Sequence, residues 1–143
     1  MCGVKRAMLI FAVLWAMGQP APGAIRQNNQ AAKEAIEAAL RGAVHKPEGN
    51  LTQEDRQKVL RLGLAGKQIT DLTPLAELPN LRQLWLHNNR LQELAPLARL
   101  KNLESLYLDH NQVTDLTPLA QCPRLQVLYL DQNRIKDLKP LGG

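Results

Sequence analysis

Residues 81–102 read LRQLWLHNNRLQELAPLARLKN, and the same pattern recurs before and after them at a period of 22 residues. Residues 59–80 read VLRLGLAGKQITDLTPLAELPN, residues 103–124 read LESLYLDHNQVTDLTPLAQCPR, and residues 125–143 read LQVLYLDQNRIKDLKPLGG. Within each repeat the piece x-L-x-L-x alternates apolar and variable residues, which predicts a short strand with one face turned inward. A fixed period of this length is typical of a solenoid, in which each repeat forms one coil and the strands stack as a parallel sheet.

Two further columns of the alignment predict how each coil turns. Asn89, Asn111 and Asn133 follow the strands, where an asparagine side chain can bond backbone groups that a turning chain leaves unpaired. Lys67 takes this place in the first coil and cannot accept such bonds, so we expect an irregular first coil. Proline precedes the last inward leucine of every coil, which excludes a second regular strand there and favours extended or 3₁₀ turns. These prolines are Pro74, Pro96, Pro118 and Pro140.

The pattern L-x-x-L-x-L-x-x-N-x-L resembles the leucine-rich repeat, and ITDLTPL, VTDLTPL and IKDLKPL resemble the short 22-residue repeats of internalin-type bacterial proteins. The resemblance covers residues 59–143. It implies an α/β fold, a short leucine-rich-repeat solenoid with parallel strands on the concave face, an irregular or 3₁₀ convex side and a helical N-terminal cap. It also implies a non-enzymatic binding scaffold whose ligand varies from protein to protein.

Residues 1–23 have the composition of a secretory signal peptide. Lys5 and Arg6 precede the apolar run Ala7–Met17, and small residues follow it. The alternative is an uncleaved N-terminal anchor, although the run is shorter than the roughly 20 residues of a membrane span. We therefore expect a secreted, periplasmic or cell-envelope protein. Loss of two basic residues takes the formal charge from +5 to +3, and the scattered charges that remain do not suggest nucleic-acid binding.

Residues 24–58 are expected to form the helical N-terminal cap of the solenoid. Asn29 is a candidate N-cap for a helix that continues to Val44 with one apolar face. Thr52-x-x-Asp55 resembles a second helix start. The first coil of a solenoid exposes apolar surface unless another element covers it, which is the role we assign to this segment. An amphipathic helix that binds a partner is the alternative.

The outward column between the second and third inward residues holds Trp85, Tyr107 and Tyr129, which are all the aromatic residues after residue 24. Neighbouring strands lie about 4.8 Å apart, so the three rings should form a continuous ladder. Exposed aromatic surface on soluble proteins often marks a contact, and we predict a ligand-binding stripe. Cross-strand stacking that only stabilises the sheet is the alternative, at about 0.2 to 1 kcal/mol per pair.

Polar residues near the stripe are predicted to set the polarity of ligand contact. They are Arg82, His87, Asp109, His110 and Asp131. Solvated surface charge is the alternative, and a metal site formed by His87, Asp109 and Asp131 is a weaker one because open strands lack an enclosing geometry. We predict no catalytic residue, metal or cofactor. Ser105 lies across the aromatic column from the histidines, Cys122 occupies an inward apolar column, and Asp71, Glu93, Asp115 and Asp137 suggest a salt-bridged surface with Arg90 and Arg134.

The size of the concave face limits the ligand. Four strands and five residues give a footprint of roughly 300 Å², against about 800 Å² per partner in a standard protein interface. A peptide, a glycan or a weak protein contact fits that area. The repeats stop at Leu141-Gly142-Gly143, so we also expect an unpaired strand edge near Leu128 and Leu130 that could support a homo-oligomer. A metal-dependent enzyme is the remaining interpretation.

Overall fold

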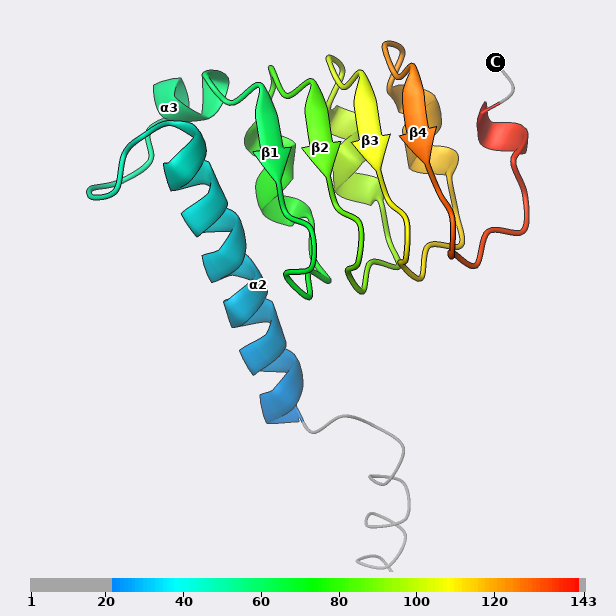
Figure 1. Ribbon diagram of the computed structural model, residues 1–143, viewed down its shortest axis with the longest axis horizontal. Helices are drawn as coiled ribbons and strands as arrows, with labels where there is room; N and C mark the ends of the chain where they lie inside the picture. Colours follow the sequence, from blue (N-terminus) through cyan, green and yellow to red (C-terminus); the bar gives the residue numbers. More distant parts are fainter. Residues whose placement is uncertain (1–21, 142–143) are drawn as a thin grey trace, which may run out of the picture.

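The structure, a computed structural model, describes residues 22–141 and shows a short solenoid with helices at its N-terminal end (Figure 1). Each coil contributes one strand to a single parallel sheet in the order β1-β2-β3-β4. The strands are β1 (Arg61–Gly63), β2 (Gln83–Trp85), β3 (Ser105–Tyr107) and β4 (Val127–Tyr129). The helices are α2 (Pro22–Ala43) and α3 (Gln53–Gln57), followed by the 3₁₀ turns η1 (Thr73–Glu77), η2 (Ala95–Arg99), η3 (Thr117–Gln121) and η4 (Lys139–Leu141).

The strands pair in the register that the 22-residue period predicts. Leu62 lies opposite Leu84, which lies opposite Leu106, so equivalent residues of successive coils are direct neighbours. The hydrogen-bonded ladder continues beyond the assigned strands, because the Leu86 amide donates to the Tyr107 carbonyl at 2.8 Å. The predicted parallel solenoid is confirmed, and a column of the sequence alignment is a row of neighbours across the sheet.

The interior consists almost entirely of the repeated leucine columns. Leu84, Leu86 and Leu106 have no measurable exposed surface, and their equivalents are similarly buried in the first three coils and partly buried in the last. Burying a leucine side chain stabilises a fold by about 1.5–3 kcal/mol, so these columns hold the coils together. Cys122 replaces a leucine in one column and is buried as predicted.

The asparagine column forms a hydrogen-bonded ladder beside the leucines. Asn111 Oδ1 accepts from the Leu91 amide at 3.1 Å, and its Nδ2 donates to the carbonyls of Leu86 and Leu108, both at 2.9 Å. Each asparagine side chain therefore hydrogen-bonds the backbone of the preceding coil as well as that of its own coil. Lys67 has no preceding coil to which its side chain could hydrogen-bond. Because β1 pairs regularly with β2, the prediction of an irregular first coil was wrong.

The convex side consists of the expected 3₁₀ turns. Pro74, for example, lies in the first residues of η1, where a backbone N–H would have no partner within the turn, so its absence costs no hydrogen bond. Asp115 Oδ1 accepts from the amide of Thr117 at 2.8 Å and from its hydroxyl at 2.6 Å, and these bonds hold the pKa of Asp115 below its usual range. Asp71 bonds Thr73 in the same way.

These bonds correct the predicted salt-bridged surface of Asp71, Glu93, Asp115 and Asp137. Asp137 likewise accepts from the Lys139 amide at 2.9 Å, so three of the four acidic residues accept a hydrogen bond from the first residue of a 3₁₀ turn. Within residues 30–141, none of the four forms an ion pair with Arg90 or Arg134. The sequence did not distinguish these uses, because both leave a carboxylate at the surface.

The helix α2 covers the N-terminal end of the core. Ala32, Ile36 and Leu40 are buried within the same apolar cluster as the leucine columns. The helix is longer than predicted, because it begins at Pro22 and passes through Asn29. Proline is well suited to the first turn of a helix, and this start extends the element by several residues. The predicted signal segment lies almost entirely outside the described residues and stays a prediction.

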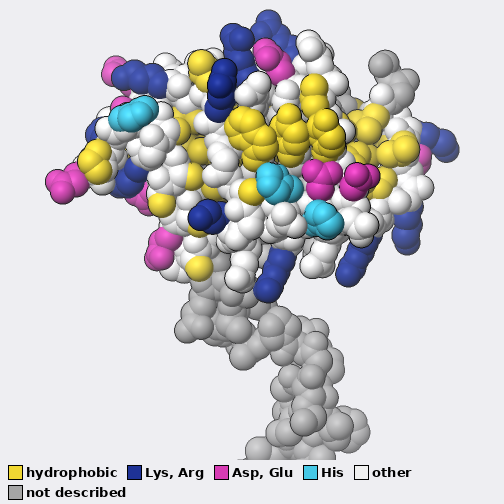
Figure 2. All heavy atoms as spheres, in the orientation of Figure 1, with side chains coloured by type: hydrophobic (Ala, Val, Ile, Leu, Met, Phe, Trp, Pro, Cys, Tyr) yellow, Lys and Arg dark blue, Asp and Glu magenta, His cyan; other side chains and the backbone are white. Residues whose placement is uncertain are grey.

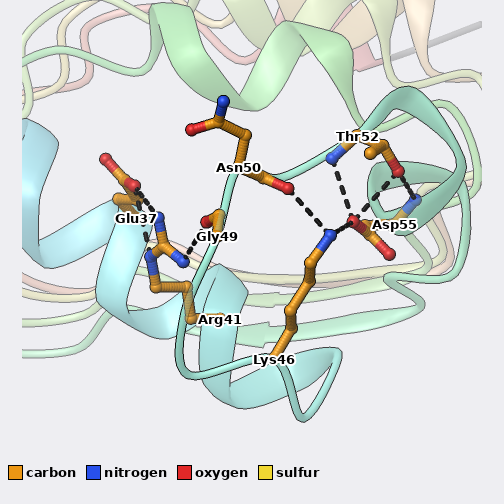
Figure 3. Close-up of polar contacts among 7 residues, drawn as sticks. All are labelled: Glu37, Arg41, Lys46, Gly49, Asn50, Thr52 and Asp55. Carbon is orange, nitrogen blue, oxygen red and sulfur yellow. Dashed lines mark hydrogen bonds and ion pairs between the residues drawn. The ribbon is translucent and has the colours of Figure 1, made fainter.

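Polar contacts tie α2 to α3 through the loop between them (Figure 3). Arg41 pairs with Glu37 at 2.6 Å and donates to the Gly49 carbonyl at 2.7 Å. Lys46 pairs with Asp55 at 2.8 Å, and Asp55 completes the predicted capping box with Thr52. The Lys46 ammonium and the Thr52 donors hold the pKa of the Asp55 carboxyl well below its usual range. The loop is therefore fixed at both ends.

Candidate functional site

The three aromatic side chains of the concave face form the stack that the sequence predicts. The ring centroids of Trp85 and Tyr107 are 5.7 Å apart with planes 12° from parallel. Those of Tyr107 and Tyr129 are 5.0 Å apart with planes 10° from parallel. The strands determine this spacing, because Trp85, Tyr107 and Tyr129 are register partners across β2, β3 and β4.

This aromatic stripe, defined as Trp85, Tyr107 and Tyr129, lies at the surface. Figure 2 shows it as a row of apolar side chains across β2, β3 and β4, with acidic and histidine side chains gathered alongside. Tyr129 is 50% exposed, and the other two rings are partly exposed. Val127 on β4 adds apolar surface beside Tyr129, with 37% of its area exposed. Tyr107 is stacked on both of its faces and offers only its edge, so free ring faces remain only at the two ends of the stack.

On the side of the strand ends, the stripe is bordered by His87, Asp109 and Asp131. The backbone ladder continues through them, since the amide of Asn88 donates to the Asp109 carbonyl at 2.9 Å. Asp109 Oδ1 also accepts from the Asp131 amide at 3.2 Å, which offsets part of the repulsion between two neighbouring carboxylates. These three predicted residues therefore form one polar row beside the rings.

His110 and Arg82 lie outside that row. His110 has a positive φ of 54°, in the left-handed region, and belongs to the turn after the strand. Arg82 lies one residue before β2, and its guanidinium pairs with Glu104 at 3.6 Å. The structure therefore places His87, Asp109 and Asp131 together beside the stripe, with His110 at the turn and Arg82 outside the strand.

Apart from Ser105, the row on the opposite side of the stripe was missed from the sequence. Its residues are register partners two positions before the aromatic column, namely Arg61, Gln83, Ser105 and Val127. Because side chains two apart on a strand share a face, the alternating pattern could have identified them. Arg61 replaces Arg82 as the strand cation of this face.

The described residues offer few groups for chemistry. Among residues 30–141, no three His, Cys, Asp or Glu side chains are grouped closely enough to hold a metal ion. Burial raises the pKa of the Cys122 thiol, despite the nearby Lys101, and Sγ donates to the Leu97 carbonyl at 3.3 Å. A protonated, buried thiol is a poor nucleophile.

The outer side of β4 is a second apolar surface. Among residues 22–141 no strand pairs with this edge. An open groove beside it is lined by side chains of the last two coils, among them Leu119, Cys122, Leu125, Leu128 and Leu141. Leu138 nearby is 62% exposed. The apolar columns therefore continue to the surface at this end.

The repeats match a known family over most of the solenoid. The family described as leucine-rich repeats in two copies matches residues 57–99 and 101–143, which together exceed half of the chain. The chain belongs to the leucine-rich repeat family. Its repeats are of the bacterial internalin type, which confirms the resemblance of ITDLTPL, VTDLTPL and IKDLKPL to such repeats. No curated protein sequence matches the chain.

Similar solved structures agree with this assignment. An internalin (inlF) from Listeria monocytogenes is 31% identical, with a TM-score of 0.72 over 87% of this chain and 36% of the internalin. A leucine-rich repeat protein of Leptospira interrogans is 36% identical, with a TM-score of 0.52 over 65% of this chain and 25% of its own. The functional domain of InlJ, also from Listeria monocytogenes, is 23% identical with a TM-score of 0.63, and it shows the fold alone.

This leucine-rich repeat chain spans only about a third of the internalin structure, since it covers 36% of that length. Over the shared length the fold is the leucine-rich-repeat solenoid. Within residues 30–141, no helix has both the length and the apolar composition needed to cross a membrane.

Proposed function

We propose that this chain is a non-enzymatic binding module whose aromatic stripe carries the ligand contact. The observation that supports this most directly is the exposed stack of Trp85, Tyr107 and Tyr129 on the concave face. Aromatic side chains supply large contact areas at low entropic cost and are enriched at binding hot spots. The stripe is also separate from the buried leucine columns, so it can be occupied without disturbing the core.

The polar row of His87, Asp109 and Asp131 gives the proposed ligand a direction. Hydrogen-bond donors or a cation of the ligand would lie on this side of the rings, opposite the carboxylates. His110, at the turn, and Arg82, beside Glu104, extend the polar border. A ligand that crosses the stripe would therefore contact an apolar centre with polar groups at its margin, as in other binding sites.

The proposed ligand is a protein segment, a peptide or a glycan, because the concave face is small. A footprint of roughly 300 Å² is well below the about 800 Å² of a standard interface side. The proposed location is the cell surface, the envelope or the medium, with residues 1–23 acting as the export signal. We propose no nucleic-acid partner, because the charges are mixed.

The test is ligand capture on peptide and glycan arrays by the full chain and two triple variants. The first variant, Trp85→Ala/Tyr107→Ala/Tyr129→Ala, removes the stripe. The matched control, Glu93→Ala/Arg99→Ala/Gln121→Ala, removes three exposed side chains outside the concave face. We expect the control to retain the ligands of the wild type and the stripe variant to lose them. Equal capture by all three proteins, with far-UV circular dichroism showing them folded, would reject the proposal.

The open edge of β4 supports a second candidate function, self-association of the chain. The unpaired edge and the groove near Leu125 and Leu128 offer backbone and apolar contacts to a second copy. Light scattering over a concentration series tests this. Concentration-dependent dimers that persist in the stripe variant would favour the edge, and a monomer at all concentrations would reject it.

A further inference from the structure

The aromatic stripe is open at its β1 end. Gly63 is the register partner of Trp85, so it occupies the fourth position of the column that holds the three rings. A Cβ atom at Gly63 would have no neighbouring atom within 4 Å, which means that the space above the glycine is empty. Figure 2 shows the row of apolar side chains crossing β2, β3 and β4 and stopping short of β1.

The backbone does not require a glycine at this position. Gly66, in the turn, has a φ of +65°, whereas the φ of Gly63 lies outside the left-handed region. Glycine in a strand weakens it and often marks a place where another molecule approaches closely. The fold thus offers no reason for the missing side chain, and the vacancy itself is the feature to explain.

The strand spacing would place a ring above Gly63 at stacking distance from Trp85. Strands repeat at about 4.8 Å, and the rings already present are 5.7 and 5.0 Å apart. A planar group above Gly63 would therefore contact Trp85 at an ordinary stacking distance, since ring centroids in such pairs lie about 4.5–7 Å apart. Among residues 30–141, Trp85 stacks only with Tyr107, so its other face has no ring partner.

A cation lies beside the vacancy. Arg61 is two residues before Gly63 on β1, and both residues are exposed on the same face. Within residues 30–141 no carboxylate pairs with Arg61. Arginine bonds carboxylates through two parallel donors, so an anionic group of a ligand fits here.

We propose that the space above Gly63 is a subsite for an aromatic side chain of a peptide ligand, stacked on Trp85, with the carboxylate of that residue bound by Arg61. A peptide with a C-terminal phenylalanine or tyrosine carries both groups on one residue. This inference rests on the proposed function, because it assumes that the ligand occupies the stripe. It adds the class of residue recognised and the direction in which the peptide lies.

The test uses the tripeptide Ala-Ala-Phe with a free carboxylate, its C-terminal amide, and glucuronate as a ring acid of a different class. Binding to the full chain is followed by the NMR shift of the Trp85 indole N–H. We expect saturable shifts with the free acid, at least tenfold weaker binding of the amide, and none with glucuronate. Saturation with glucuronate alone, or no saturable shift up to about 10 mM peptide, would overturn the inference.

The decisive variant is Gly63→Tyr, which fills the vacancy with a ring from the chain itself. Its matched control is Gly42→Tyr, because Gly42 is an exposed glycine that also has open space around it. We expect Gly63→Tyr to bind the peptide at least tenfold more weakly and Gly42→Tyr to bind it as the wild type does. Unfolding by urea shows whether each variant is folded, and we expect Gly63→Tyr to be at least as stable as the wild type.

Two further variants separate this subsite from the stripe. Arg61→Gln should weaken binding of the free acid to the level of the amide, and it tests the subsite without altering its shape. If Gly63→Tyr binds normally while Trp85→Ala loses binding, the stripe remains and the subsite is rejected. If both variants bind normally, the proposed function fails together with the subsite.

Discussion

The inward and outward columns of the solenoid differ in what varies from coil to coil. The inward positions hold leucine or another apolar residue, with asparagine after the strand from the second coil onward, and they are buried in the inner coils, as at Leu84 and Asn89. The outward positions change along the sheet, from glycine at residue 63 to tryptophan and tyrosine in the next coils. Leu84 and Trp85 belong to the same three-residue strand, so the backbone does not cause the difference.

Under the proposed function, this difference means that the repeat separates folding from recognition. Buried leucines and hydrogen-bonded asparagines are constrained by the coil on either side, and a change in one is felt by its neighbours. The outward side chains meet solvent and each other, so their identity is free to follow a ligand. The predictions below test how complete this separation is.

The largest effect is expected from Asn111→Ala, which breaks the inward ladder. The substitution removes the partner of the Leu91 amide and of the carbonyls of Leu86 and Leu108. An unsatisfied buried group costs about 1–3 kcal/mol, so the free energy of unfolding should fall by about 3 kcal/mol or more. Urea denaturation followed by circular dichroism measures this, and a loss below about 1 kcal/mol would contradict the role of the ladder.

A smaller effect is expected at the cap that covers the inward columns. Asp55 binds Lys46 and Thr52, and its pKa is lowered in the folded state. A carboxyl whose pKa is lowered on folding stabilises the fold at pH values above the usual carboxyl pKa. This stabilisation is lost as the pH falls below about 4. Asp55→Asn should therefore lower the urea midpoint at pH 7, and the gap to the wild type should narrow progressively between about pH 4 and pH 2.

The control for this prediction is Glu48→Gln, an exposed acid in the same loop. The urea midpoint of Glu48→Gln should match that of the wild type both at pH 7 and at pH 2. A gap between Asp55→Asn and the wild type that stays constant from pH 7 to pH 2 would show that the carboxylate charge of Asp55 is unimportant for the cap.

The smallest effect is expected from Lys67→Asn, which places the ladder residue in the first coil. There is no preceding coil for its side chain to bond, and Lys67 is exposed. The free energy of unfolding should change by less than about 0.5 kcal/mol, as for most surface substitutions. A gain of more than about 1 kcal/mol would show that the asparagine acts mainly within its own coil.

Much of this architecture could be predicted because the repeat determines it locally. The spacing of leucines gave the strands and their register, and proline before the last leucine gave the 3₁₀ turns. Stacking of the rings followed from Trp85 and Tyr107 occupying one column. Each inference needed only the period and the geometry of a strand.

The sequence predictions that differ from the structure concern features that the repeat period does not determine. The regular first coil was missed, because only the structure shows that Asn89 bonds the preceding coil through Lys67 and Ile69. The start of α2 was misplaced because Asn29 is compatible with a cap and with a helix interior. Arg61 was not identified because its place on the concave face depends on where β1 begins, and strand ends are poorly defined by sequence.

The separation of folding from recognition is tested most directly by comparing Tyr107→Ala with Asn111→Ala, two changes in the same coil. The measurement is the free energy of unfolding of each variant in urea. Tyr107→Ala removes two ring pairs at about 0.2 to 1 kcal/mol each, so it should cost clearly less than the loss of the asparagine ladder. A cost for Tyr107→Ala equal to or greater than that for Asn111→Ala would contradict the account, because the stripe would then be a structural element of the sheet.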